Sequence, residues 1–114
     1  MTTDTSAFEA YRAGVQSRLF GGIREHVDRL GWSAERIAVH QRDGLRALLA
    51  HAIARSPFHA GRLAGVDAER LELGDLSRLP VMTKSEMMDD LDDAVTDRRL
   101  SRGLLEETIA RTAG

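Results

Sequence analysis

The sequence predicts an all-α protein, and three observations lead to this prediction. Apolar residues make up 42% of the 114 residues but aromatic residues only 4%, so any core must consist mainly of Leu, Ala, Ile, Val and Met, which suits helices better than strands. Long stretches place apolar residues every three or four positions, the spacing of one helix face. No alternating strand pattern occurs, because residues 79–82 are too few and contain a proline. We expect several helices in a small irregular bundle, forming a single domain over residues 1–114.

The first long helix is expected over about residues 6–30. Ser6 and Glu9 have the spacing of a capping box, in which the serine oxygen accepts the backbone N–H of the glutamate and the glutamate reaches back. A glycine pair at 21–22 costs about 1 kcal/mol per residue relative to alanine, but the apolar phase continues across it, which favours one bent helix. Gly31 is expected to end this helix. Its apolar stripe consists of Phe8, Tyr11, Val15, Leu19, Ile23, Val27 and Leu30.

A second long helix is expected over about residues 33–55. Ser33 can cap its start, and Pro57 forbids its continuation because proline lacks a backbone N–H. His51 lies close to the apolar face, so we expect a partly buried, hydrogen-bonded histidine rather than a metal ligand. That face is formed by Ile37, Gln41, Leu45, Leu48, Leu49, Ala52 and Ile53.

Four shorter helices are expected in the second half of the chain, and three of them follow a side chain that can cap a helix. Asp67 and Ser101 can each accept a hydrogen bond from a backbone N–H of the first turn. Thr83 and Glu86 have the spacing of a second capping box. The four helices are expected at about residues 58–64, 67–73, 83–95 and 101–112.

Composition and charge exclude several classes of partner and chemistry. Sixteen Lys and Arg against eighteen Asp and Glu give a net charge of -2, which provides no excess positive field to hold a nucleic acid. The absence of cysteine excludes disulfides, thiolate catalysis and Cys-based zinc sites, and it fits a reducing cytoplasm. The polar N-terminus does not resemble a secretory signal, and no run of about 20 apolar residues occurs. We predict a cytoplasmic protein with no nucleic-acid or membrane partner.

The acidic run at residues 89–93 is the most obvious candidate for a metal site. It fits the Asp-Asp-x-x-Asp pattern with which prenyl-diphosphate synthases hold magnesium, but those enzymes need an opposing acidic motif and a far longer helical barrel. A solvated helix face, neutralised by Lys84, Arg98 and Arg99, is the preferred interpretation. The histidines lack the spacing of a helical zinc site, and no phosphate-binding glycine loop or nucleophile elbow is present. We therefore assign no catalytic, cofactor-binding or metal-binding residue.

Two segments, residues 45–59 and 76–88, carry short motifs in a recognisable order. The motif positions are His51, Ala52, Pro57, Phe58, Leu79, Pro80, Thr83 and Lys84. This order resembles the N-terminal region of the phenylacetate-CoA ligase-like branch of the adenylate-forming, AMP-binding enzymes. There a helix ending in His-Ala and a Pro-Phe-Tyr motif are followed by Leu-Pro-x-x-Thr-Lys. His59 stands where the family usually has tyrosine, and the resemblance covers about residues 41–105, whereas residues 1–40 hold the first helix and the start of the second.

The resemblance implies a helical preface to a large adenylating domain, which activates a carboxylate with ATP and passes the acyl group to coenzyme A. In the family a Ser/Thr/Gly-rich phosphate loop comes later in the chain, and this sequence ends at Gly114 about where that loop would be expected. We therefore expect an N-terminal segment of an acyl- or aryl-CoA ligase-like protein, truncated before the nucleotide-binding motifs and inactive alone. ATP with magnesium, and coenzyme A, are implied only for a complete family member.

A stand-alone helical protein-interaction module is the alternative function. Without an adenylating domain, Val81, Met82, Met87 and Met88 would be uncovered, and exposed apolar patches tend to bind partners. The expected partner is the missing adenylation domain or a second copy of the chain in a homodimer. A third alternative, an independent small enzyme, lacks any set of paired titratable groups in its favour.

Overall fold

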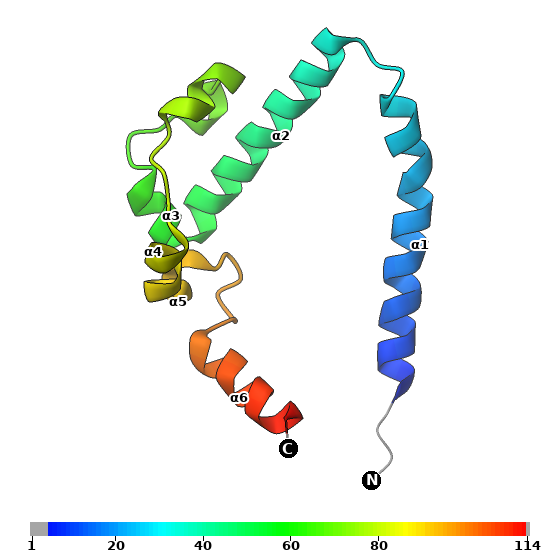
Figure 1. Ribbon diagram of the computed structural model, residues 1–114, viewed down its shortest axis with the longest axis vertical. Helices are drawn as coiled ribbons and strands as arrows, with labels where there is room; N and C mark the ends of the chain where they lie inside the picture. Colours follow the sequence, from blue (N-terminus) through cyan, green and yellow to red (C-terminus); the bar gives the residue numbers. More distant parts are fainter. Residues whose placement is uncertain (1–4, 114) are drawn as a thin grey trace. The chain divides into compact units, whose positions relative to one another are not determined.

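The computed structural model describes residues 5–113, and within that range it contains helices and no strand, which confirms the all-α prediction (Figure 1). None of the helices in this range is long and apolar enough to cross a membrane. The chain divides into two compact units, Met1–Ile37 and Ala38–Gly114. A single domain over residues 1–114 stays a prediction.

The first unit contains helix α1, Thr5–Arg29. Ser6 lies inside this helix and not before it, so the predicted capping box of Ser6 and Glu9 is wrong. The helix continues without interruption through the glycine pair at 21–22, as expected from the unbroken apolar phase. No residue of α1 is buried, and the seven apolar residues of the predicted stripe each expose between 39% and 85% of their surface.

A short connection leads from α1 to helix α2, Ala34–Arg55. Ser33 caps α2 as predicted, because its Oγ accepts the backbone N–H of Arg36 at 3.2 Å. The guanidinium of Arg36 lies 3.9 Å from the ring centroid of Trp32, and that of Arg29 lies 5.9 Å from it. These cation–π contacts stabilise the connection on both sides of the tryptophan.

The second unit is built around one face of α2 and a small hydrophobic core. Successive turns of the helix contribute Leu45, Leu49 and Ile53 to this core, since residues four apart lie on one face. Leu48, which the sequence analysis placed on the same face, is 64% exposed. The other members of the core are Leu63, Val66, Ala68, Leu71 and Leu79.

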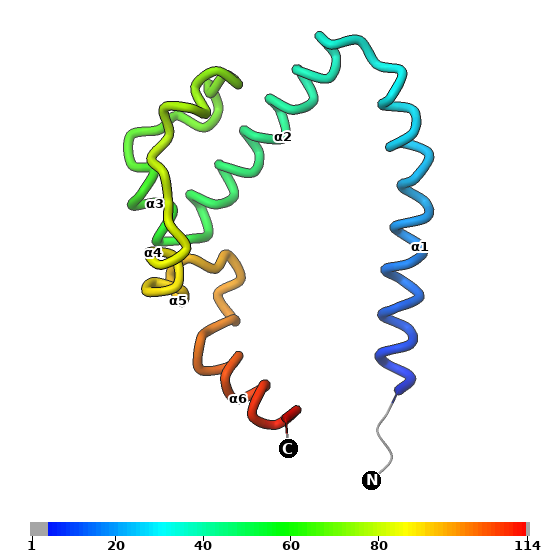
Figure 2. Tube along the Cα trace, in the orientation of Figure 1, coloured from blue at the N-terminus to red at the C-terminus, as the bar shows by residue number. Residues whose placement is uncertain are grey.

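The remaining elements are short and follow α2 closely. The chain after α3 runs out beside α2 and returns to α4 (Figure 2), and Arg46 of α2 holds the outward segment through a 2.7 Å hydrogen bond from its Nε to the carbonyl of Leu71. The elements are α3, Pro57–Arg62; two 3₁₀ helices, Ala68–Arg70 and Leu73–Arg78; α4, Lys84–Asp89; α5, Leu91–Ala94; and α6, Arg102–Thr112.

Two predicted helices differ from the structure. The helix expected over residues 67–73 is only a 3₁₀ turn, because the chain becomes extended at Leu71, where the side chain enters the core and the carbonyl accepts a hydrogen bond from Arg46. The helix expected over residues 83–95 is interrupted at Asp90 and continues as α5. Aspartate is a weak helix former, and the neighbouring carboxylates of this run repel one another.

Candidate functional site

Four of the eight motif positions, Pro57, Phe58, Thr83 and Lys84, lie on α3 and at the start of α4. Pro57 is the first residue of α3, and the preceding Ser56 caps that helix by accepting the backbone N–H of His59 at 3.2 Å. Thr83 caps α4: its Oγ1 accepts the backbone N–H of Glu86 at 3.1 Å, and its own N–H donates to Glu86 Oε2 at 2.8 Å. The predicted capping box is therefore confirmed.

Arg62 connects the two groups of motif residues. Its Nη1 donates a 2.5 Å hydrogen bond to the carbonyl of Pro80, while its Nε donates to Nδ1 of His59 at 3.4 Å. The rings of Phe58 and His59 meet edge to face, with centroids 5.2 Å apart. A surface hollow of about 340 Å³, here called the Phe58 hollow, is lined by Phe58, Arg62, Val81, Glu86, Asp89 and Asp90.

Two ionisable groups beside the Phe58 hollow have shifted pKa values. Partial burial lowers the pKa of His59 below its ordinary value, and the positive charge of Arg62 lowers it further. The backbone N–H of Thr83 lowers the pKa of Glu86, and the threonine hydroxyl adds to this effect. At neutral pH His59 is therefore uncharged and Glu86 is ionised. Nδ1 of His59 can then accept the hydrogen bond from Arg62, and the carboxylate of Glu86 can accept the one from the backbone N–H of Thr83.

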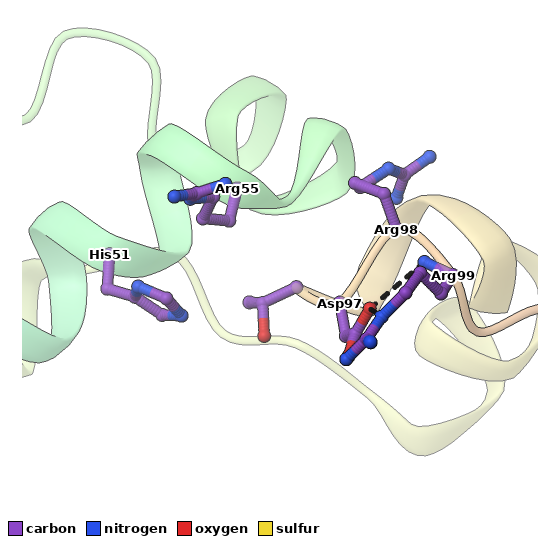
Figure 3. A pocket seen from close by; sticks show the side chains of 6 residues that line it. His51, Arg55, Asp97, Arg98 and Arg99 are labelled. Carbon is purple, nitrogen blue, oxygen red and sulfur yellow. Dashed lines mark hydrogen bonds and ion pairs between the residues drawn. The ribbon is translucent and has the colours of Figure 1, made fainter.

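The other motif positions do not line the Phe58 hollow. Lys84 is the exposed first residue of α4. His51 lies on α2, and its predicted state is wrong: the residue is exposed and makes no hydrogen bond to any residue of the described range. It lines a second surface hollow of about 410 Å³, the basic hollow, together with Arg55, Thr96, Asp97, Arg98 and Arg99 (Figure 3).

The charges around the basic hollow are unequally compensated. Arg99 donates to both carboxylate oxygens of Asp97, at 2.7 Å and 3.0 Å, and this pairing lowers the pKa of Asp97 to about 2. Arg98 donates to the carbonyls of Asp92 and Val95 at 2.8 Å and 3.3 Å. Arg55, in contrast, makes no hydrogen bond or ion pair with any part of the chain that the structure describes, so its charge faces solvent.

The acidic run at residues 89–93 has exposed carboxylates, as the solvated interpretation predicts. Asp92 Oδ1 accepts the backbone N–H of Arg102 at 2.6 Å, and Asp93 lies 3.8 Å from Arg98. Of the three expected partners only Arg98 is close, since Arg99 pairs with Asp97. Among residues 5–113, no three His, Cys, Asp or Glu residues are grouped so that they could hold a metal ion.

Sequence reasoning missed three residues on which these arrangements depend. Ser56 is only 1% exposed, and the pattern of a serine directly before a proline at a helix start could have revealed its capping role. Arg55 lies four residues after His51 on α2, so the two share one face. Arg62 carries no local signal, because its partner Pro80 belongs to another segment of the chain.

Comparison of the chain with protein-family models, with curated proteins and with solved structures found no match. No family is therefore assigned by these comparisons.

Proposed function

We propose that this chain is a helical scaffold segment of an acyl- or aryl-CoA ligase-like protein of the ATP-dependent, AMP-forming type, and that it is not catalytic alone. The observation that carries the proposal is the hydrogen bond from Arg62 to the carbonyl of Pro80. It holds the Pro57-Phe58 motif against the segment that leads to Thr83 and Lys84. Two motifs that are separate in the sequence thereby form one small structural unit, which supports a shared packing role.

The surface beside this unit supports a role in packing against another domain. Val81 is 89% exposed, and Met82, Met87 and Met88 are each only partly buried. Apolar side chains of this kind are commonly covered by a partner, and methionine adapts well to such a surface. In the proposal the covering partner is an adenylating domain of the ligase type.

The proposal assigns no chemistry to the chain itself. ATP with magnesium, and coenzyme A, would be bound by the adenylating domain, and the protein would act in the cytoplasm. The full chain incubated with ATP, coenzyme A and a panel of aromatic acids should release no AMP above background. Release that depends on both an acid and the chain would contradict a purely structural role.

The most direct test is the DNA that follows the coding sequence of residue 114. If the proposal is right, the DNA that follows should encode a Ser/Thr/Gly-rich phosphate loop, either in the same reading frame or in an adjacent one. An unrelated sequence there would count heavily against the proposal.

Site-specific cross-linking would test the packing surface independently. A photo-reactive amino acid at Val81 should cross-link to a polypeptide that contains such a phosphate loop, whereas the same group at Leu76 should not. Leu76 is a suitable control because it is also exposed, at 54%, but lies outside the Phe58 hollow. Equal cross-linking from both positions would argue against a specific surface at Val81.

A stand-alone interaction module that forms a homodimer is the second candidate, and α1 favours it. This helix buries none of its residues within the described range, although it carries Phe8, Tyr11 and Leu19 at exposures of 61–69%. Light scattering on the purified chain should give the mass of a dimer if this candidate is right. Leu19→Glu should then produce monomers, whereas Ser17→Glu should not, because Ser17 lies on the other side of the helix. A monomer without the substitution would rule out an obligate homodimer.

A further inference from the structure

The geometry points to a binding site for the phosphate group of a small molecule in the basic hollow. His51 and Arg55 line one side of the hollow from consecutive turns of α2, and residues 96–99 line the other side (Figure 3). This inference does not depend on the proposed ligase-like function. It uses residues that the Phe58 hollow does not contain.

The charge in the basic hollow is suited to an anion. Three arginines and one aspartate line it, and the aspartate is neutralised by its paired hydrogen bonds to Arg99. The nearest other carboxylate to Arg98 is that of Asp93, at 3.8 Å and on the exposed surface. The guanidinium of Arg55 has no partner among residues 5–113, so it is available to an incoming group without breaking an existing contact.

The donors in the basic hollow match phosphate chemistry. The Arg55 guanidinium presents a planar set of N–H groups that can donate two hydrogen bonds to one oxyanion. The imidazole of His51 and the hydroxyl of Thr96 can each donate one more. A phosphate group has more oxygens than a carboxylate and can therefore accept hydrogen bonds from more of these donors at once.

The size and surroundings of the hollow favour a small molecule over a polymer. Its volume of about 410 Å³ is within the range of small-molecule sites and leaves room for an organic group beyond the phosphate. The chain carries a net charge of -2, and a nucleic acid would require an extended basic surface. A phosphate monoester or a diphosphate of low molecular mass is therefore the ligand class.

Nuclear magnetic resonance titration of the full chain would test this site. Inorganic phosphate and pyrophosphate should produce saturable shifts of the backbone amides of His51, Arg55 and residues 96–99. Acetate at the same ionic strength serves as the planar carboxylate probe and should bind several-fold more weakly. Shifts that do not saturate, or that spread evenly over all arginines, would overturn the inference, and so would equal affinities for phosphate and acetate.

Substitutions would locate the binding groups. Arg55→Gln should weaken pyrophosphate binding about tenfold, as expected for the loss of a charged hydrogen bond. Arg55→Lys should recover part of the affinity, because it restores the charge without the planar donors. Arg70→Gln is the matched control, since Arg70 is 88% exposed and outside the hollow, and it should leave binding unchanged. Equal losses in Arg55→Gln and Arg70→Gln would mean general charge attraction and would overturn the site.

His51→Ala provides a second route to the same answer. His51 is exposed, so its replacement should not affect folding, which circular dichroism can verify. Pyrophosphate binding should weaken at least several-fold. Unchanged affinity in this variant would exclude His51, and with it the proposed geometry of the site.

Discussion

The hydroxyl of Ser56 donates a 2.8 Å hydrogen bond to the backbone carbonyl of Asp93, which lies 37 residues further along the chain. The same oxygen accepts the backbone N–H of His59, so one buried atom both caps α3 and holds the end of α5. Ser56 is only 1% exposed, and water cannot replace either bond. The Ser56 hydroxyl therefore provides a hydrogen bond within the contact between α3 and α5.

Replacement of Ser56 by alanine should destabilise the second unit by about 1–3 kcal/mol, because a backbone donor and a backbone acceptor would both lose a buried partner. Urea unfolding followed by circular dichroism would measure the change. Ser77→Ala is the control: its hydroxyl donates to the carbonyl of Gly74 at 3.2 Å, but on the exposed surface. Similar losses in both variants would contradict the special role of burial at Ser56.

Leu63 is the most deeply buried hydrophobic residue of the described core, at 2% exposure. Leu63→Ala should lower the free energy of unfolding by about 2–4 kcal/mol, since it removes apolar contacts and leaves a cavity. Leu48→Ala should change it by less than about 1 kcal/mol, because Leu48 is 64% exposed and surface substitutions have small effects. Equal effects in thermal or urea unfolding would mean that the core lies elsewhere.

Arg46 fixes the segment that runs out beside α2. Its Nε donates to the carbonyl of Leu71, and its Nη2 lies 2.8 Å from Glu72 Oε1. Arg46→Met should cost about 1–2 kcal/mol, because the carbonyl bond is partly buried while the exposed ion pair contributes little.

Hydrogen exchange would show whether the effect of Arg46→Met is local. The amides of residues 66–72 should exchange faster in this variant. Arg42→Met removes a pair with Asp43 at 3.4 Å but no hydrogen bond to the segment, and it should leave exchange there unchanged. Unaltered exchange in Arg46→Met would show that the core alone positions the segment.

The parts of the fold that sequence could predict depend on neighbouring residues. The caps at Ser33, Asp67, Thr83 and Ser101 are confirmed, because each bond joins residues two or three positions apart. The interruption at Asp90 and the extended chain at Leu71 were not predicted. The segments concerned are held by distant residues, through the bonds Ser56–Asp93 and Arg46–Leu71, and periodicity contains no information on such contacts.

The candidate sites also contain features that depend on neighbouring residues and features that depend on residues far apart in the sequence. The motif order drew attention to residues of α3 and α4, but it predicted no contact between them and did not indicate that Arg62 connects them. The basic hollow was missed entirely, because its two sides come from α2 and from residues 96–99. The expectation for His51 was wrong because this residue lies two positions from both Leu49 and Ile53, which belong to the core. Residues two apart lie on different sides of a helix, so His51 is exposed.

The pH dependence of His59 provides the last prediction. Its pKa is lowered below the ordinary value of 6.5, first by partial burial and then by Arg62, so the fold favours the neutral imidazole. The unfolded chain therefore binds more protons between the two pKa values. Stability from this group is complete above pH 6.5 and is lost as the pH falls from 6.5 through the lower pKa of the folded state.

Nuclear magnetic resonance titration of the His59 ring protons should thus give a midpoint below 6.5, while Arg62→Gln should raise the midpoint without restoring the ordinary value, because burial is the larger cause. His59→Gln should remove this part of the pH dependence of unfolding. A midpoint at or above 6.5 would mean that the fold does not favour the neutral imidazole, and that His59 is protonated in the fold at any pH below that midpoint. Its Nδ1 could then no longer accept the hydrogen bond from Arg62, and the connection between α3 and Pro80 would have to rest on the single bond to the proline carbonyl.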